Sequence, residues 1–295
     1  MNTQKLAPIV VIPARNEAET IASVVKQVIN CGMPALVVDD QSEDTTGEIA
    51  KQAGATVIET RGQVGYGTAI IAGLQYAVSN DCSHVITIDG DGAHDASEIP
   101  RIFNHHISNS CHLTIGDRFV NINTEIPSTK KWANHFAAKL FNLVLDTDLK
   151  DVACGFRVLN RQFAESLLQT GDSLYPGFGF AYSMIAVAKQ SFDFCSTPVS
   201  VRYDGTILHC TNSQEIIDML TTLSKYSMPE KNVLKNISKI HGIIMHGEAT
   251  TVLFDESQLC LLPVPHLKAY IFQLQNQVFL QQKAGSVVDF RLPLK

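Results

Sequence analysis

Continuous apolar runs alternate with segments of helical periodicity through the first part of the chain. An apolar run is typical of a strand buried on both faces, and apolar residues three or four positions apart are typical of a helix packed on such a sheet. The pattern predicts an α/β fold, a Rossmann-like three-layer α/β/α arrangement around a mainly parallel sheet with right-handed crossovers. Predicted strands cover 7–13, 35–38, 56–59, 84–88, 113–115 and 198–203, and predicted helices cover 18–29, a segment ending at 49–54, 68–78, 131–145 and 181–189.

The pattern changes near Met228. Residues 229–232, Pro-Glu-Lys-Asn, are typical of a linker, and beyond them apolar and polar residues alternate as in half-buried strands. We therefore predict one large α/β domain over residues 1–228 and a small β-rich appendage over 229–295, a candidate region for homo-oligomer contacts. The predicted strands of the appendage cover 251–254, 269–274 and 287–292.

Composition narrows the class of protein. With 45% hydrophobic and 18% charged residues, the chain is expected to fold, and a net charge of -6 argues against nucleic acid as the main partner. No run approaches the roughly 20 apolar residues of a membrane span, and the start of the chain lacks the apolar core of a signal peptide. We expect a cytoplasmic protein that can make peripheral contact with the inner face of the membrane. The seven scattered cysteines include no CxxC pair and are expected to be reduced.

Acidic residues follow three of the predicted strands. Glu17 comes after the first strand, Asp39-Asp40 end the second, and Asp89-Gly90-Asp91 follow the fourth. Ligands of parallel α/β sheets bind beyond the carboxyl ends of the strands, so these carboxylates are expected to converge. A lone DxD is more often a solvated turn, but convergence favours a site for a hard divalent ion, Mg²⁺ or Mn²⁺.

Five sequence blocks point to one family. They are VIPARNE at 11–17, VVDDQSEDT at 37–45, IDGDGAHD at 88–95, GDRFV at 116–120 and DVACGFR at 151–157. The first three resemble the inverting family 2 glycosyltransferases with the GT-A fold, and the last two are similar to the dolichyl- and polyprenyl-phosphate sugar transferase branch. The resemblance covers about residues 7–205.

The resemblance implies roles for the matching positions, with a UDP-sugar or GDP-sugar as donor and Mg²⁺ or Mn²⁺ as cofactor. The implied nucleotide contacts are Pro13, Arg15, Glu17, Asp39, Asp40 and Asp89. The implied metal ligands are Asp91 and Asp89. The implied phosphate or acceptor contacts are Arg118, Lys130, Lys131 and Arg157. The implied catalytic group is Asp89, Asp91, Arg118 and Asp151.

The acceptor is inferred from an absence. Relatives commonly carry an acidic residue in the stretch that matches 178–183, and this chain has none. A hydroxyl acceptor needs a general base, whereas a phosphate monoester is largely dianionic at neutral pH. We therefore expect attack on the anomeric carbon with inversion by a polyprenyl phosphate or another phosphate-bearing acceptor, while the metal and Arg118 neutralise the leaving diphosphate. A hydroxyl acceptor, with Asp151 or Asp95 as the base, is the alternative.

Other interpretations stay open. Trp132, Phe136, Leu140 and Val144 recur every four residues beside Lys130-Lys131, which suits either a lipid surface or ordinary core packing. Residues 65–69, GYGTA, form either a loop near the donor or a purely structural turn, and His94 is the one histidine expected in the site. A sugar-nucleotide-binding protein without catalysis and a DxDG-type phosphatase are less favoured functions.

Overall fold

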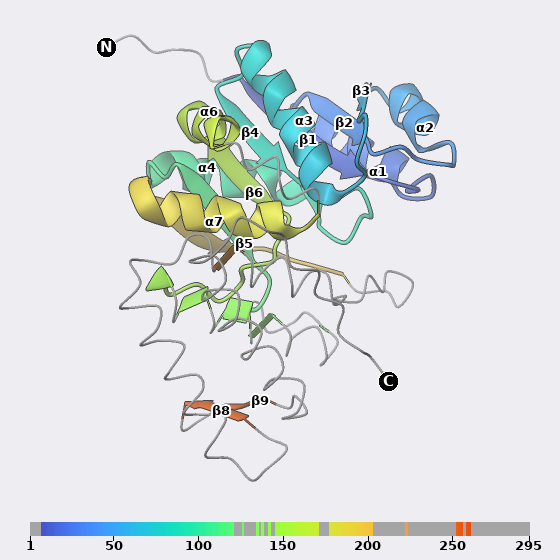
Figure 1. Cartoon of the computed structure of the whole chain (residues 1–295). Helices are drawn as coiled ribbons and strands as arrows, with labels where there is room; N and C mark the ends of the chain where they lie inside the picture. The colour runs from blue at the N-terminus through green and yellow to red at the C-terminus, as the bar shows by residue number, and fades with distance from the viewer. Residues whose placement is uncertain are drawn as a thin grey trace, which may run out of the picture.

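The computed structural model describes residues 7–120, 126, 134–135, 137–138, 141–142, 145–170, 177–202 and 222–223, and the backbone of 252–255 and 258–260. Figure 1 shows the α/β unit formed by the first two thirds of the chain. It is built around a seven-stranded sheet of order β3-β2-β1-β4-β6-β5-β7. The strands are β1 Pro8–Ala14, β2 Ala35–Asp39, β3 Thr56–Glu59, β4 His84–Thr87, β5 Leu113–Asp117, β6 Arg157–Asn160 and β7 Phe194–Pro198.

The pairing is mainly parallel. β1 pairs in parallel with β2 and β4, β2 with β3, and β5 with β7. β6 is the exception, because it runs antiparallel to both β4 and β5. The fold class inferred from the sequence is therefore confirmed, and the carboxyl ends of β1, β2 and β4 lie side by side at one edge.

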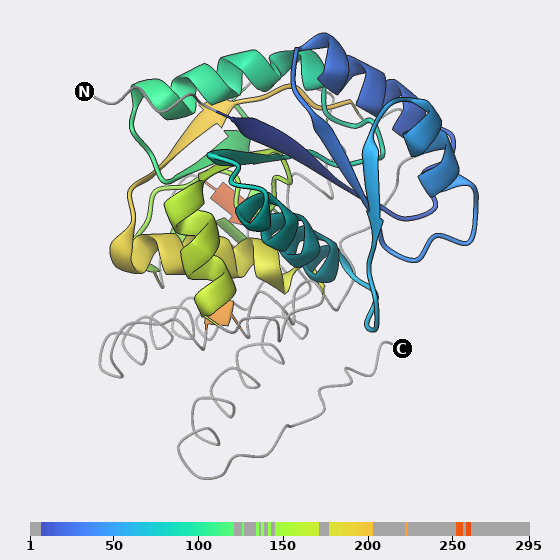
Figure 2. The ribbon, with the colours of Figure 1, turned by 90° about the horizontal axis from the view of Figure 1, so that it is seen from above.

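Helices cover both faces of this sheet, as Figure 2 shows, with α1 and α4 on one face and α3, α6 and α7 on the other. In α1 the buried residues recur at helical spacing, and burial of each such side chain contributes about 1.5–3 kcal/mol. Gly73 lets α3 approach β1 closely, because a β-carbon there would lie 2.3 Å from Val11 Cγ1. The helices are α1 Ile21–Asn30, α2 Thr46–Gln52, α3 Tyr66–Ser79, α4 Ile99–Ser108, α6 Arg161–Gln169 and α7 Gly179–Ser191, with a 3-10 turn, η1, at Ala96–Glu98.

The sequence patterns missed some elements. β6, α4 and α6 were not predicted, and β7 covers 194–198 rather than the predicted 198–203. In that predicted range Val201 makes an isolated bridge with His94, and residue 203 lies outside the described residues. In the predicted helix 131–145, the described residues are helical at 134–135, 137–138, 141–142 and 145. The four residues of the apolar stripe lie outside the described residues: Trp132, Phe136, Leu140 and Val144. Within the described part of the chain, no helix has the length and apolarity to cross a bilayer.

Two short strands are described in the predicted C-terminal appendage. β8 Val252–Asp255 and β9 Gln258–Cys260 form an antiparallel pair, which confirms a strand at 251–254. The predicted strands at 269–274 and 287–292, and the domain boundary at 228/229, lie outside the described residues.

The expectation that every cysteine is reduced is wrong for one pair. Cys111 and Cys195 form a disulfide although 84 positions separate them. The register of β5 with β7 pairs Leu113 with Phe194, and this brings the two cysteines together.

Candidate active site

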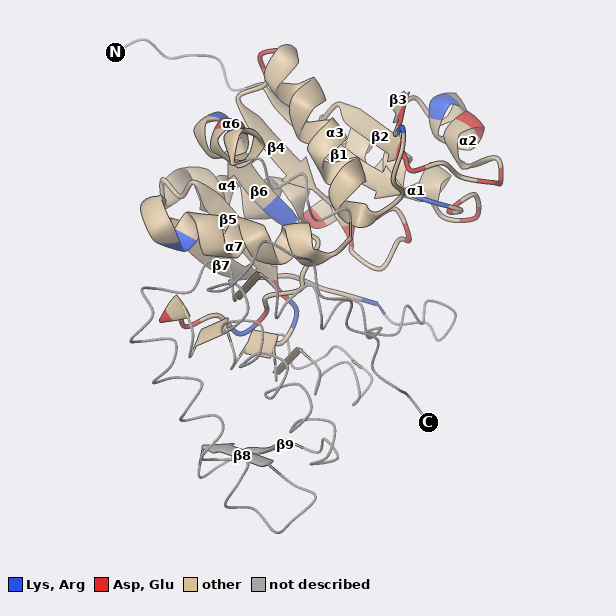
Figure 3. Cartoon of the chain, viewed as in Figure 1, with Lys and Arg blue, Asp and Glu red and all other residues tan. Residues whose placement is uncertain are grey.

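Acidic residues follow the carboxyl ends of the strands, and Figure 3 marks several of them in red along the loops around α1 and α2. Glu17 lies between β1 and α1, and Asp89 and Asp91 lie beyond β4, the strand next to β1. Burial, followed by the negative charge of Asp91 and of Asp89, raises the pKa of Glu17 to about 7, although a hydrogen bond from Thr20 opposes the shift. The three carboxylates therefore share one electrostatic neighbourhood.

A hydroxyl joins the two acidic loops. Thr20 Oγ1 donates to the carbonyl oxygen of Gly90 at 2.8 Å and lies 3.2 Å from Glu17 Oε2. Gly90 stands between the two aspartates of the DxD segment, so Thr20 fixes the position of that segment relative to Glu17. Thr20 was not predicted as a site residue, because nothing in the sequence motif indicates that its hydroxyl bonds to the loop that holds Gly90.

The raised pKa of Glu17 predicts how stability depends on pH in the absence of a divalent ion. Between pH 4.5 and about 7 the folded chain retains a proton on Glu17 that the unfolded chain releases. The contribution of Glu17 to the free energy of unfolding is therefore fully present below pH 4.5 and is lost as the pH rises through about 7. We expect Glu17→Gln to reduce the fall in the free energy of unfolding between pH 4.5 and pH 8, measured by urea denaturation in EDTA. An unchanged fall would contradict the raised pKa of Glu17.

Asp44 and Thr46 hold the backbone at Glu17. The amide of Glu17 donates to Thr46 Oγ1 at 2.7 Å, and the amide of Ala18 donates to Asp44 Oδ2 at 3.2 Å. The Thr46 hydroxyl donates in turn to Asp44 Oδ1. Although burial opposes it, hydrogen bonds from Thr46 and Ala18 lower the pKa of Asp44, which keeps the carboxylate charged. Asp44 therefore belongs to the framework that presents Glu17.

The two aspartates after β2 are engaged inside the protein. Asp40 accepts from Thr60 Oγ1 and from the amide of Gly65, each at 2.6 Å, so it holds the loop between β3 and α3. Asp39 Oδ1 accepts from the amide of Ser42 at 2.9 Å. Both carboxylates are nearly buried. The predicted nucleotide contact by Asp40 would have to be made in addition to these two hydrogen bonds, by a residue that is 4% exposed.

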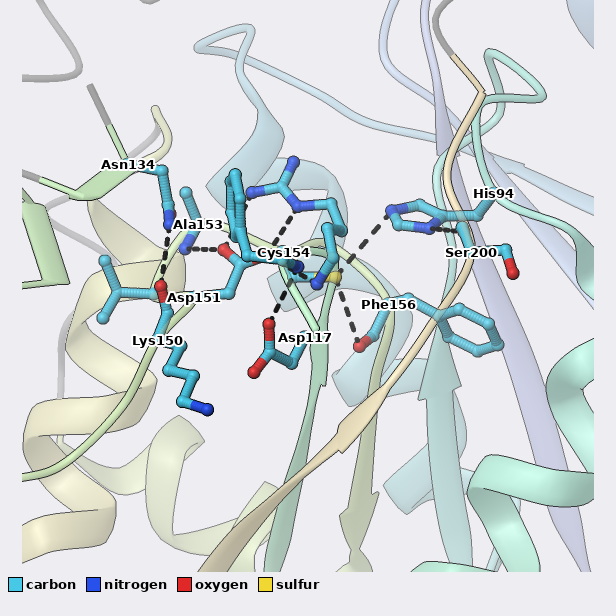
Figure 4. A network of polar contacts seen from close by, with 12 residues as sticks. His94, Asp117, Asn134, Lys150, Asp151, Ala153, Cys154, Phe156 and Ser200 are labelled. Carbon is cyan, nitrogen blue, oxygen red and sulfur yellow. Dashed lines mark hydrogen bonds and ion pairs between the residues drawn. The ribbon is translucent and has the colours of Figure 1, made fainter. Parts of the chain in front are cut away.

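Arg118 and Asp151 form a bidentate ion pair. Arg118 Nε lies 2.6 Å from Asp151 Oδ2, and Arg118 Nη2 lies 2.8 Å from Asp151 Oδ1. The amide of Ala153 also donates to Asp151 Oδ1, at 3.1 Å (Figure 4). The Asp151 side chain is fully buried and that of Arg118 is 15% exposed. Asp151 therefore differs from the predicted catalytic base: its oxygens are occupied, and it orients Arg118.

Arg157 also departs from its predicted role as a phosphate or acceptor contact. It is fully buried at the start of β6. Its Nε donates to the carbonyl oxygen of Cys154 at 2.8 Å, its Nη2 to that of Val152 at 3.1 Å, and its Nη1 to that of Ala181 at 2.5 Å. The guanidinium is therefore directed at main-chain carbonyl groups in the interior.

His94 links the acidic group to the Arg118 pair. Its Nε2 lies 3.9 Å from Asp89 Oδ2, and its Nδ1 lies 3.3 Å from the carbonyl oxygen of Ser200 (Figure 4). Burial and then the positive charge of Arg118 lower the pKa of His94 to about 4, while Asp91 acts in the opposite direction. The imidazole is therefore neutral at pH 7, and it lies close to both Arg118 and the DxD carboxylates.

Gly155 seats Asp89. A β-carbon on Gly155 would lie 2.4 Å from Asp89 Oδ1 and 2.5 Å from Oδ2, so the absence of a side chain makes room for the carboxylate. The Gly155 carbonyl oxygen accepts from Thr87 Oγ1 at 2.6 Å. Gly155 lies in the fifth sequence block, yet the sequence alone assigned it no role, because its partner lies 66 positions earlier.

The other predicted residues are placed as follows. Arg15 is exposed and Pro13 is partly buried, at the end of β1. Lys130 and Lys131 lie outside the described residues.

The carboxylates fit a divalent ion that is shared with a substrate. Within the described ranges, no group of three or more acidic, histidine or cysteine side chains forms a ready-made metal site. Mg²⁺ is commonly bound by one or two carboxylates together with water and substrate phosphates. Asp89 and Asp91 offer such hard oxygen ligands, and the charge they place next to Glu17 is what a cation would relieve.

Comparison with known proteins identifies the family. The family model described as Glycosyl transferase family 2 matches residues 9–168. An uncharacterized protein of Methanocaldococcus jannaschii is 29% identical over 74% of this chain and 98% of its own length. A dolichyl-phosphate hexose transferase of Haloferax volcanii is 28% identical over 65% of this chain and 82% of its own length. A polyprenol monophosphomannose synthase of Mycolicibacterium smegmatis is 27% identical over 54% of this chain and 63% of its own length.

Solved structures agree with the fold. Glucosyl-3-phosphoglycerate synthase from Mycobacterium tuberculosis, in complex with Mn²⁺, UDP-glucose and phosphoglyceric acid, superposes with a TM-score of 0.60 at 19% identity. The match covers 77% of this chain and 82% of that one. At this identity the likeness concerns the fold, and the family assignment rests on the sequence match. The chain belongs to glycosyl transferase family 2.

Proposed function

We propose that the chain is an inverting glycosyltransferase that moves a sugar from a nucleotide diphosphate donor to a phosphate-bearing acceptor. UDP is favoured over GDP as the nucleotide, and polyprenyl phosphate is favoured as the acceptor. The observation that carries the proposal is the contact between the Glu17 loop and the DxD segment. Thr20 Oγ1 donates to the carbonyl oxygen of Gly90 and lies 3.2 Å from Glu17 Oε2, and His94 Nε2 lies 3.9 Å from Asp89 Oδ2.

The arrangement of charge suits departure of a diphosphate. Asp91 and Asp89 would hold Mg²⁺ or Mn²⁺, which supplies positive charge to the leaving group when bound. Arg118 contributes a second positive charge, and Asp151 fixes its orientation before the reaction. Glu17 would accept hydrogen bonds from hydroxyl groups of the donor.

The state of the candidate bases supports a phosphate acceptor. Asp151 is buried in its pair with Arg118, and Asp95 accepts from the amide of Ser97 as the cap of η1. Hydrogen bonds from Ser97 lower the pKa of Asp95, which makes it a weaker base. A phosphate dianion attacks without a base. The names of the Haloferax and Mycolicibacterium relatives, a dolichyl-phosphate transferase and a polyprenol monophosphomannose synthase, favour a lipid-linked phosphate.

A direct assay tests this proposal. The full chain is incubated with UDP-glucose or GDP-mannose and Mn²⁺, and offered either polyprenyl phosphate in detergent or a soluble phosphate monoester. We expect EDTA-sensitive transfer from the UDP-sugar to the lipid phosphate, with an inverted anomeric configuration by NMR. Transfer only to a hydroxyl acceptor, or binding of sugar nucleotide without turnover, would overturn the proposal.

The Thr20 hydroxyl provides a finer test. Thr20→Val keeps the branched shape but leaves the Gly90 carbonyl group without its donor, so the DxD segment loses its tie to Glu17. We expect a transfer rate about tenfold lower in this variant, whereas Thr20→Ser, which keeps the hydroxyl, retains most of the rate. Equal initial rates for the valine and serine variants would show that the hydroxyl is unimportant.

A further inference from the structure

Arg157 occupies an unusual position for a charged side chain. It is the largest fully buried side chain among the described residues. Its recorded hydrogen-bond acceptors are three main-chain carbonyl oxygens and the sulfur of Met184, at 3.5 Å from Nη1. Burying a cation is costly unless its environment compensates the charge, so a guanidinium in this setting needs a reason.

Two of those carbonyl groups belong to one short loop. Val152 and Cys154 lie within 151–155, the segment between Asp151 and β6, and the third carbonyl group is that of Ala181 in α7. The planar guanidinium reaches all three at once, which the single ammonium group of lysine cannot do. Arg157 thus ties the loop 151–155 to α7.

The same loop serves two parts of the site. At one end, Asp151 makes the bidentate pair with Arg118. At the other end, Gly155 lies against the carboxylate of Asp89. A displacement of the loop would therefore move the group that orients Arg118 and would change the space available to Asp89.

We infer that Arg157 is a positioning residue: by holding the loop 151–155 through its main-chain carbonyl groups, it sets both the guanidinium of Arg118 and the carboxylate of Asp89. This inference rests on the proposed function, since it assigns those two groups to sugar transfer. It also makes a claim about the loop itself that can be measured without any substrate.

The first experiment measures the loop. Hydrogen–deuterium exchange is compared in wild type, Arg157→Lys and Arg157→Gln, with Arg161→Lys as the matched control. Arg161 starts α6 beyond the other end of β6 and bonds to Asp81 and Glu165. We expect the amides of 152–156 to exchange about tenfold faster or more in both Arg157 variants and at the wild-type rate in the control. Unchanged exchange in the Arg157 variants would overturn the inference, whatever reaction the protein catalyses.

The second experiment measures the consequence for the reaction. For Arg157→Lys, kcat per folded molecule should fall by about 100-fold, while the donor KM stays within about threefold, because displaced groups act mainly in the transition state. The double variant Arg157→Lys, Gly155→Ala should lose less kcat than the product of the two single fold-reductions, since both substitutions act on Asp89. An unchanged kcat, multiplicative effects, or failure of both Arg157 variants to fold would leave Arg157 with a role in stability alone. Absence of turnover in the wild type would instead count against the proposed function.

Discussion

Asp91→Asn is expected to lower sugar transfer by about 100- to 1000-fold and to abolish the metal-dependent part of UDP binding. Asp91 Oδ1 accepts from the amide of Ala93 at 2.9 Å, a bond that an asparagine oxygen can also accept, so the loop should keep its shape. What disappears is the negative charge, which a divalent ion needs and which raises the pKa of Glu17. Initial rates and calorimetric titration with UDP and Mn²⁺ measure the two effects.

A matched control separates local from general charge effects. Asp81→Asn removes the same charge at a site that pairs with Arg161, close to the start of β4 and away from the carboxyl ends of the strands. This variant should transfer sugar at the wild-type rate. Equal metal-dependent binding of UDP by wild type and Asp91→Asn would contradict the assignment of Asp91.

Gly155→Ala is expected to reduce the transfer rate by about 100-fold with only a small loss of stability. The added methyl group would lie 2.4 Å from Asp89 Oδ1, and the nearest atoms that it meets all belong to that one side chain. An aspartate carboxylate can rotate away, so the fold survives, but Asp89 leaves the position from which we propose that it contacts the donor. Steady-state rates normalised to folded protein, together with thermal unfolding, measure both effects.

Gly73→Ala is the matched control for that variant. Its methyl group would lie 2.3 Å from Val11 Cγ1 at the contact between α3 and β1, where the surrounding core cannot yield so easily. We expect a clear loss of stability and a wild-type rate per folded molecule. If Gly155→Ala kept the wild-type kcat, the proposed role of Asp89 would be wrong.

Local patterns were sufficient for the strands that build the acidic edge. β1, β2, β3 and β4 are short apolar runs, and a parallel sheet places the residues that follow such runs at one edge. Glu17 and the DxD segment could therefore be placed together from the sequence. β6 was missed because it starts with an arginine, whose burial depends on acceptors from Val152, Cys154 and Ala181.

The predicted site residues that make contacts inside the protein share a physical cause. Charged residues in a sequence block were expected to meet ligands, but Asp151 and Arg157 are satisfied inside the protein by partners that tertiary packing supplies. The sequence also does not reveal which small residue must make room for a functional one. Gly155 against Asp89 and Thr20 against Gly90 are contacts between segments that meet only in the folded sheet.

The most direct test of the account is a crystal structure of the chain with UDP and Mn²⁺, with the ion located by anomalous diffraction. The account predicts an anomalous peak beside Asp91 and the diphosphate, with the uridine held on the side of Glu17. A peak elsewhere, or UDP bound away from Glu17 and Asp91, would contradict the claim that these carboxylates form the donor site.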